Sequence, residues 1–129
     1  MAVENDWLVE GRVVITRLSG SISIEELLAG SREGTAMIDS GKPPVYSLVD
    51  MSELVSFPLR IAEMKKLTDL GTSPNLRWVL IYGITNRLVS FLATTFTQLL
   101  RTSYKVFDTQ EDALAFIHKL DTSIAPPQH

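Results

Sequence analysis

Short apolar runs alternate along the chain with longer segments of helical spacing, and polar turns separate them. Five of the runs are rich in β-branched and aromatic residues, which favour extended strands over helices. These predicted strands cover residues 7–9, 13–18, 45–49, 78–82 and 104–107. The first two are joined by a tight turn at Glu10-Gly11-Arg12, which predicts a hairpin.

The segment after the second strand carries a well-marked helix start. Ser23 and Glu26 have the spacing of a capping box, and Ile22 and Leu27 occupy the positions of a hydrophobic staple. The helix is expected to end near Ser40, before Gly41 and two prolines. Its predicted inner face combines apolar and small residues: Ile24, Leu27, Leu28, Ser31, Gly34, Thr35 and Ile38. The small residues allow either close packing against a sheet or room for a ligand.

Three further helices are expected over residues 58–70, 87–101 and 110–120. Pro58 suits a first helical position, Asn86 can cap the third helix, and Thr109 precedes an acidic first turn in the last. The order β-β-α-β-α-β-α-β-α predicts one α/β domain over residues 1–122, with a mostly parallel sheet of four or five strands and about four helices. Residues 123–129 are expected to be a disordered tail.

Several short phrases on this pattern resemble the SpoIIAA-like, or STAS-like, family. They are Trp7 leading the opening strand, Gly20 before Ser-Ile-Glu-Glu-Leu, Pro43-Pro44 before Val-Tyr-Ser-Leu-Val-Asp50, Trp78 in the fourth strand, and the closing Thr-Gln-Glu-Asp-Ala-Leu-Ala-Phe. The resemblance covers nearly the whole chain. It implies a small non-enzymatic α/β domain that binds proteins, since the best-known members are anti-sigma-factor antagonists.

The chain departs from the family at its phosphorylation motif. Signalling members place a phosphorylatable serine in an Asp-Ser-Ser-Gly-like motif at the start of the helix after the Asp-bearing strand, where this chain has Phe57-Pro58-Leu59-Arg60. The family motif therefore predicts no phosphorylation site here. Ser52 and Ser56 lie nearby without matching the motif, and a phosphate on either would sit near a helix N-terminus.

Composition narrows the remaining possibilities. The 129 residues carry a net charge of -3 and no cysteine, which argues against nucleic-acid binding, disulfides and thiolate chemistry. Neither a signal segment nor an apolar run long enough for a bilayer is evident, so a cytoplasmic protein without membrane insertion is expected. The two histidines, His118 and His129, form no metal-ligand spacing, and no metal or cofactor is predicted.

Asp50 is the strongest polar candidate because it ends a predicted buried strand. It can contact a ligand or partner there, or accept backbone N–H bonds in the turn that follows. The segment from Gly83 to Asn86 and Arg87 can hold an anion or simply cap a helix. An enzyme would have to rest on Asp50 and Glu53, which is a remote option.

The predicted third helix has an unusually wide apolar arc, spanning roughly half its circumference where a surface helix needs ~100°. The excess face can be buried, line an apolar cavity or contact a second copy. The interface candidates on this helix are Leu88, Phe91, Leu92 and Phe96.

Two functional hypotheses follow. The first is a non-enzymatic, self-associating interaction module with a protein partner or a second copy as its target. The second is a carrier of a small apolar or lipid-like ligand, by analogy with CRAL-TRIO domains, with a pocket at Ser31, Gly34 and Thr35.

Overall fold

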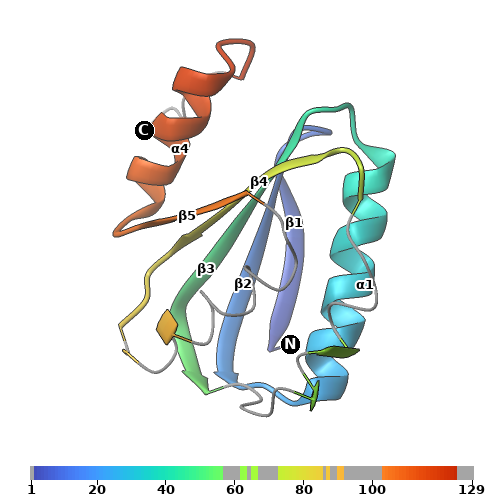
Figure 1. Cartoon of the computed structure of the whole chain (residues 1–129), viewed down its shortest axis with the longest axis vertical. Helices are drawn as coiled ribbons and strands as arrows, with labels where there is room; N and C mark the ends of the chain where they lie inside the picture. The colour runs from blue at the N-terminus through green and yellow to red at the C-terminus, as the bar shows by residue number, and fades with distance from the viewer. Residues whose placement is uncertain are drawn as a thin grey trace.

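Five strands lie side by side in the order of the sequence (Figure 1). The computed structural model describes residues 2–56, 62–63, 65–66, 73–85, 87, 90–91 and 103–124. The strands are β1 (Val3–Val9), β2 (Val13–Ser21), β3 (Val45–Ser56), β4 (Leu76–Tyr82) and β5 (Tyr104–Phe107). β1 pairs with β2 antiparallel and every later pair is parallel, which confirms the predicted α/β sheet.

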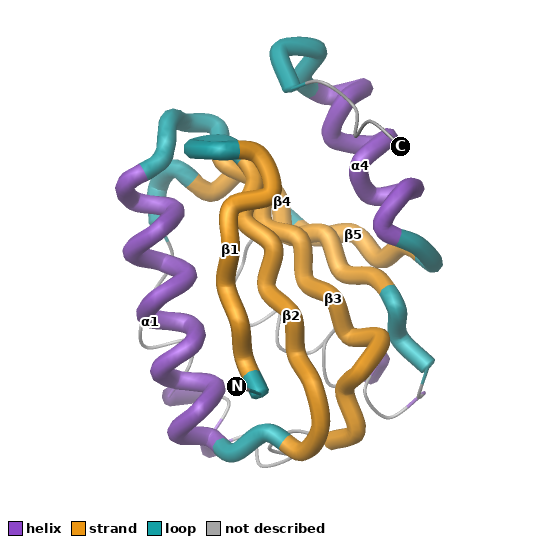
Figure 2. Tube along the Cα trace, turned by 180° about the vertical axis from the view of Figure 1, so that it is seen from behind, coloured by secondary structure: helices purple, strands orange, loops and turns teal. Residues whose placement is uncertain are grey.

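Two helices are described over their full length: α1 (Ile24–Ser40) and α4 (Gln110–Leu120). The helices expected over residues 58–70 and 87–101 fall largely outside the described residues, although the individual residues described there are helical. α1 packs beside β1 and β2, whereas α4 contacts β3, β4 and β5 at the other end of the sheet (Figures 1 and 2).

The side-chain alternation of the strands assigns the two helices to opposite faces. Val13 and Ile15 of β2 share a buried cluster with Leu114 and Ile117 of α4. Val14, which lies between them, packs instead with Ile38 of α1. Because successive strand residues point to opposite faces, the central strands are covered on both sides and read as continuous apolar runs.

The start of α1 is as expected. The Ser23 hydroxyl accepts a bond from the Glu26 N–H at 3.1 Å, and the Glu26 carboxylate accepts one from the Ser23 N–H at 3.0 Å. These reciprocal bonds satisfy two backbone donors at the helix start. Ile22 and Leu27 meet in one hydrophobic cluster, as a staple requires.

Small residues of α1 fit tightly against β1. A Cβ added at Gly30 would lie 2.3 Å from Val3 Cγ1, and one added at Gly34 would lie 3.2 Å from Asn5 Oδ1. Asn5 Nδ2 donates to the Gly30 carbonyl at 2.9 Å, while Asn5 Oδ1 accepts from the Thr16 hydroxyl at 2.6 Å. The space at Gly34 is therefore filled by Asn5, which confirms close packing there.

Four strands, β1 to β4, are longer than predicted, and β1 and β3 gain the most residues. β1 starts at Val3 because the whole segment pairs with β2, from Val3 opposite Leu18 onward. β3 runs to Ser56 because it keeps pairing with β2 after its ladder with β4 ends at Tyr82. Asp50 thus lies inside a strand rather than at its end, and Ser52 lies in the same strand rather than in a turn after it, so both expected positions are wrong.

Candidate functional site

A polar row crosses the sheet near the end of the β3–β4 ladder. Arg17 of β2 lies opposite Asp50 of β3, which lies opposite Tyr82 of β4. Register partners share a face, and Tyr82 belongs to the cluster under α4, so the row points to the α4 side of the sheet. Asp6 on β1 extends it, with its carboxylate 3.5 Å from Arg17 Nη1.

Asp50 holds the backbone of its own strand. Its Oδ1 atom accepts bonds from the Ser52 N–H at 2.9 Å and from the Ser52 hydroxyl at 2.6 Å. The β2–β3 register shifts at this point, as in a β-bulge, and Gly83 approaches so closely that an added Cβ would lie 2.9 Å from the Ser52 nitrogen. The backbone-binding interpretation of Asp50 is thereby supported, within a bulged strand rather than a loop turn.

Tyr82, like Asp6 and Arg17, belongs to this row without having been predicted from the sequence. Its side chain is 5% exposed, and among the described residues its hydroxyl has no hydrogen-bond partner of good geometry. Burial, followed by the negative charge of the adjacent Asp50 carboxylate, raises the pKa of Tyr82 to about 12. A phenol with a raised pKa stays protonated near neutral pH, so the Tyr82 hydroxyl is a weak acid there.

The remaining predicted site residues do not gather around Asp50 in the described part of the chain. Ser56 donates to the Ser21 hydroxyl at 3.1 Å at the far end of the β2–β3 ribbon. Arg87 is exposed, and Phe91 is 66% exposed. Asn86, together with the interface candidates Leu88, Leu92 and Phe96, lies outside the described residues.

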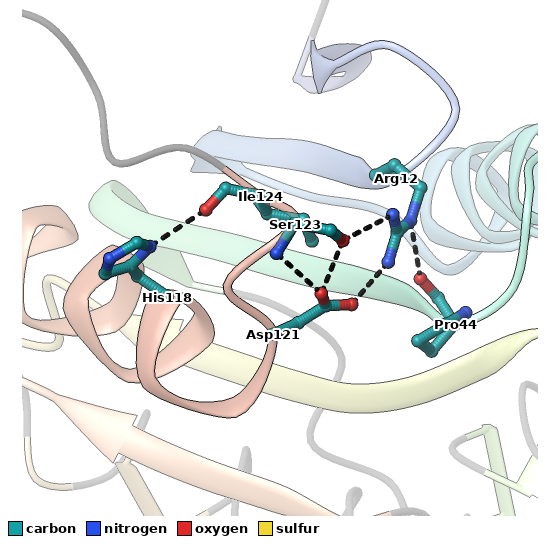
Figure 3. Close-up of polar contacts among 6 residues, drawn as sticks. All are labelled: Arg12, Pro44, His118, Asp121, Ser123 and Ile124. Atoms are coloured by element: carbon teal, nitrogen blue, oxygen red, sulfur yellow. Dashed lines mark hydrogen bonds and ion pairs between the residues drawn. The ribbon is translucent and has the colours of Figure 1, made fainter.

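The opposite end of the sheet is closed by an ionic cluster that the sequence did not suggest (Figure 3). Arg12, in the β1–β2 turn, donates to the Pro44 carbonyl and the Ser123 hydroxyl, both at 3.1 Å, and pairs with the Asp121 carboxylate after α4. The Ser123 hydroxyl and backbone N–H also donate to Asp121. Bonds from Ser123 and then from Arg12 lower the pKa of Asp121. The only sequence signal was the Asp-Thr-Ser spacing typical of a side-chain turn.

The same cluster extends the folded domain beyond residue 122. Ile124 is 3% exposed and belongs to the core under α4, and its carbonyl lies 3.0 Å from His118 Nδ1. Ser123 and Ile124 are therefore packed parts of the domain rather than tail, and His118 has a backbone partner. Residues 125–129 lie outside the described residues.

An open groove borders the sheet where β5 meets α4. It has a volume of about 460 Å³ and is lined by Lys105, Val106, Phe107, Asp108, Asp112, Ala115, Phe116 and Lys119. Lys105 Nζ lies 4.8 Å from the centroid of the Phe116 ring and 5.6 Å from that of Phe107. Lys105 therefore places its charge over two of the aromatic rings that line the groove.

Metal-binding clusters and membrane-spanning helices are absent from the described residues. No group of three or more His, Asp or Glu side chains there is arranged to hold a metal ion. No helix within the described ranges is long and apolar enough to cross a membrane.

Comparison with known proteins identifies the fold. The chain matches no protein-family model, and no curated protein matches it. Among solved structures it is similar to an uncharacterized protein of the DUF3478 family with a SpoIIAA-like fold from Shewanella loihica PV-4. The two share 20% sequence identity over 89% of this chain and 91% of that chain, with a TM-score of 0.57. The chain thus has a SpoIIAA-like fold, as the resemblance implied.

Proposed function

We propose that this chain is a non-enzymatic, STAS-like interaction module that associates with a second copy of itself. The observation that carries the proposal is the outer edge of β5. Within the described sheet β5 pairs only with β4, and the side chain of its residue Val106 is 42% exposed. A sheet edge with exposed backbone groups and an apolar side chain is a ready template for another strand.

The polar groups of the described domain support an interaction role over a catalytic one. Asp50 binds the backbone and hydroxyl of Ser52, and Asp121 binds Arg12 and Ser123. Each carboxylate thus has a structural task already. The wide groove beside β5, with both signs of charge and aromatic rings, has the mixed character of a protein-binding surface.

Native mass spectrometry of the purified chain over a range of concentrations tests this proposal. We expect a dimer of the bare chain mass that dissociates on dilution. A bare monomer at every concentration would contradict self-association. An added small-molecule mass that is lost on denaturation would instead support the carrier hypothesis and identify its ligand class.

A further inference from the structure

The charges of the β5–α4 groove are separated along its length. The chain leaves β5 at Phe107, turns at Asp108, and enters α4, whose first turn carries Asp112. Lys119 lies in the last turn of α4, and Lys105 lies near the start of β5. The groove therefore has an acidic end at the β5–α4 turn, a basic end away from it, and aromatic rings between them.

The ladder of β5 shows which of its backbone groups are open. The Val79 N–H donates to the Ser103 carbonyl at 2.9 Å, and Val79 is paired with Tyr104. In a parallel ladder the residues of one strand alternate in the direction of their backbone groups. Ser103 and Lys105 therefore direct theirs toward β4, whereas Tyr104 and Val106 direct theirs outward.

From these two observations we infer that β5 pairs antiparallel with β5 of a second copy, around a twofold axis at Val106, to form one continuous sheet. This inference rests on the proposed function and specifies its interface. A twofold axis perpendicular to the sheet requires partners on the same face, which the pairing of Val106 with its own copy satisfies. Outward N–H and C=O groups of Val106 then exchange bonds, and Tyr104 lies opposite Asp108 of the second copy.

The same twofold rotation makes the groove complementary to itself. It turns the second copy end for end, so that the basic end of one groove faces the acidic end of the other. Lys105 of each copy then lies opposite Phe107 and next to Asp108 of the other copy, and the Lys119 end of each α4 is directed toward the Asp112 end of the other. Such a charge arrangement favours antiparallel pairing and disfavours the parallel one, in which like charges would meet.

Charge reversal at the two ends tests the inference by analytical ultracentrifugation. The variant Asp108→Lys/Asp112→Lys makes the groove basic at both ends, and Lys105→Glu/Lys119→Glu makes it acidic at both ends. Each variant alone should dimerise about tenfold more weakly than wild type or worse, because four attractive contacts become repulsive. An equimolar mixture of the two should form heterodimers, since each basic end then faces an acidic one.

A matched control separates this effect from net charge and from helix stability. Glu25→Lys/Glu111→Lys changes the net charge by the same amount as Asp108→Lys/Asp112→Lys does. It also places lysines in first helical turns, but neither residue lines the groove. We expect this control to dimerise like wild type. Thermal unfolding by circular dichroism checks that all variants fold.

The outcomes distinguish this inference from the proposal on which it rests. If wild type dimerises and both charge-reversed variants dimerise equally well, self-association stands and the β5 interface is wrong. If the two variants weaken association but do not combine with each other, the antiparallel arrangement is wrong. If wild type is monomeric at every protein concentration, the proposal of self-association is wrong.

Discussion

The two outer strands of the sheet, β1 and β5, differ in how they meet their surroundings. β1 is seven residues long and tied to α1 through Asn5 and Gly30, and it carries acidic side chains at Glu4 and Asp6. β5 is four residues long, and its outer residue Val106 is apolar and exposed. Charged residues and covering elements are the usual protection of a sheet edge against other strands. Among the described residues, this comparison supports our proposal that β5, rather than β1, is the edge that pairs with another copy.

The strongest test of this difference between the two edges is a pair of proline substitutions in β5. Lys105→Pro should destabilise the domain by about 2 kcal/mol, because it removes an N–H directed toward β4 and leaves a carbonyl unpaired. Val106→Pro should leave the fold nearly as stable as wild type, since its N–H points outward and proline is tolerated at such edge positions. It should nevertheless abolish dimerisation.

Urea denaturation gives the stabilities of both variants, and sedimentation gives their association. The comparison between neighbouring residues is the control, because both variants carry the same substitution in the same strand. If Val106→Pro unfolds the domain as much as Lys105→Pro does, the assigned direction of the β5 backbone groups is wrong.

At the protected edge, Gly30→Val should destabilise the domain by about 1–3 kcal/mol, because the new side chain meets Val3 where even a Cβ would lie at 2.3 Å. Ala29→Val, on the exposed side of the same helix, controls for the helix propensity of valine. A second substitution, Val3→Ala, should recover part of the loss by making room. Chemical denaturation measures all three, and equal stabilities for the two valine variants would contradict tight α1–β1 packing.

Acid sensitivity should be concentrated at the Arg12–Asp121–Ser123 cluster. Asp121 has a folded pKa below its ordinary value, so its contribution to stability is present above about pH 4 and is lost as the pH falls toward the folded pKa. Asp121→Asn should therefore lower stability at neutral pH and flatten the decline of stability in acid. Melting temperatures measured between neutral and acidic pH check this. If the variant loses as much stability in acid as wild type does, the prediction is wrong.

The smallest effect is expected at Tyr82. Tyr82→Phe should change stability by only about 0.5 kcal/mol at neutral pH, because the lost hydroxyl has no hydrogen-bond partner of good geometry among the described residues.

The pH dependence of stability in the Tyr82→Phe variant tests whether the raised pKa of Tyr82 affects folding. The folded pKa of Tyr82, about 12, lies above its ordinary value near 10, so wild type loses stability as the pH rises through this interval. The variant should lose less over the same interval. A large loss of stability in Tyr82→Phe at neutral pH would show that the hydroxyl is bonded after all.

Local signals in the sequence predicted most of the fold. The capping box at Ser23 and Glu26 and the apolar strands depend on residues that are close in sequence, and the structure confirms both. The alternation of strands and helices along the chain predicted the parallel pairs, which the structure also confirms. The length of β3 could not be predicted, because its second half is held by pairing with β2 rather than by its own composition. The SpoIIAA-like resemblance supplied the fold family but no site residues that the structure tests.

The sites were harder to predict because they join distant parts of the chain. Arg12 and Asp121 are 109 residues apart, and Tyr82 meets Asp50 only through the β3–β4 register. The groove charges are close in sequence, but their arrangement depends on α4 turning back along β5. The interface assigned from sequence to the third helix remains a prediction, since most of its residues lie outside the described part.

The most direct test of the central claim, that β5 is the associating edge, is amide hydrogen exchange by NMR at a series of protein concentrations. We predict that the Val106 amide exchanges quickly in dilute protein and slowly once dimers form, while the Lys105 amide, directed toward β4, stays protected at every concentration. A Val106 amide that exchanges at the same rate in monomer and dimer would contradict the claim.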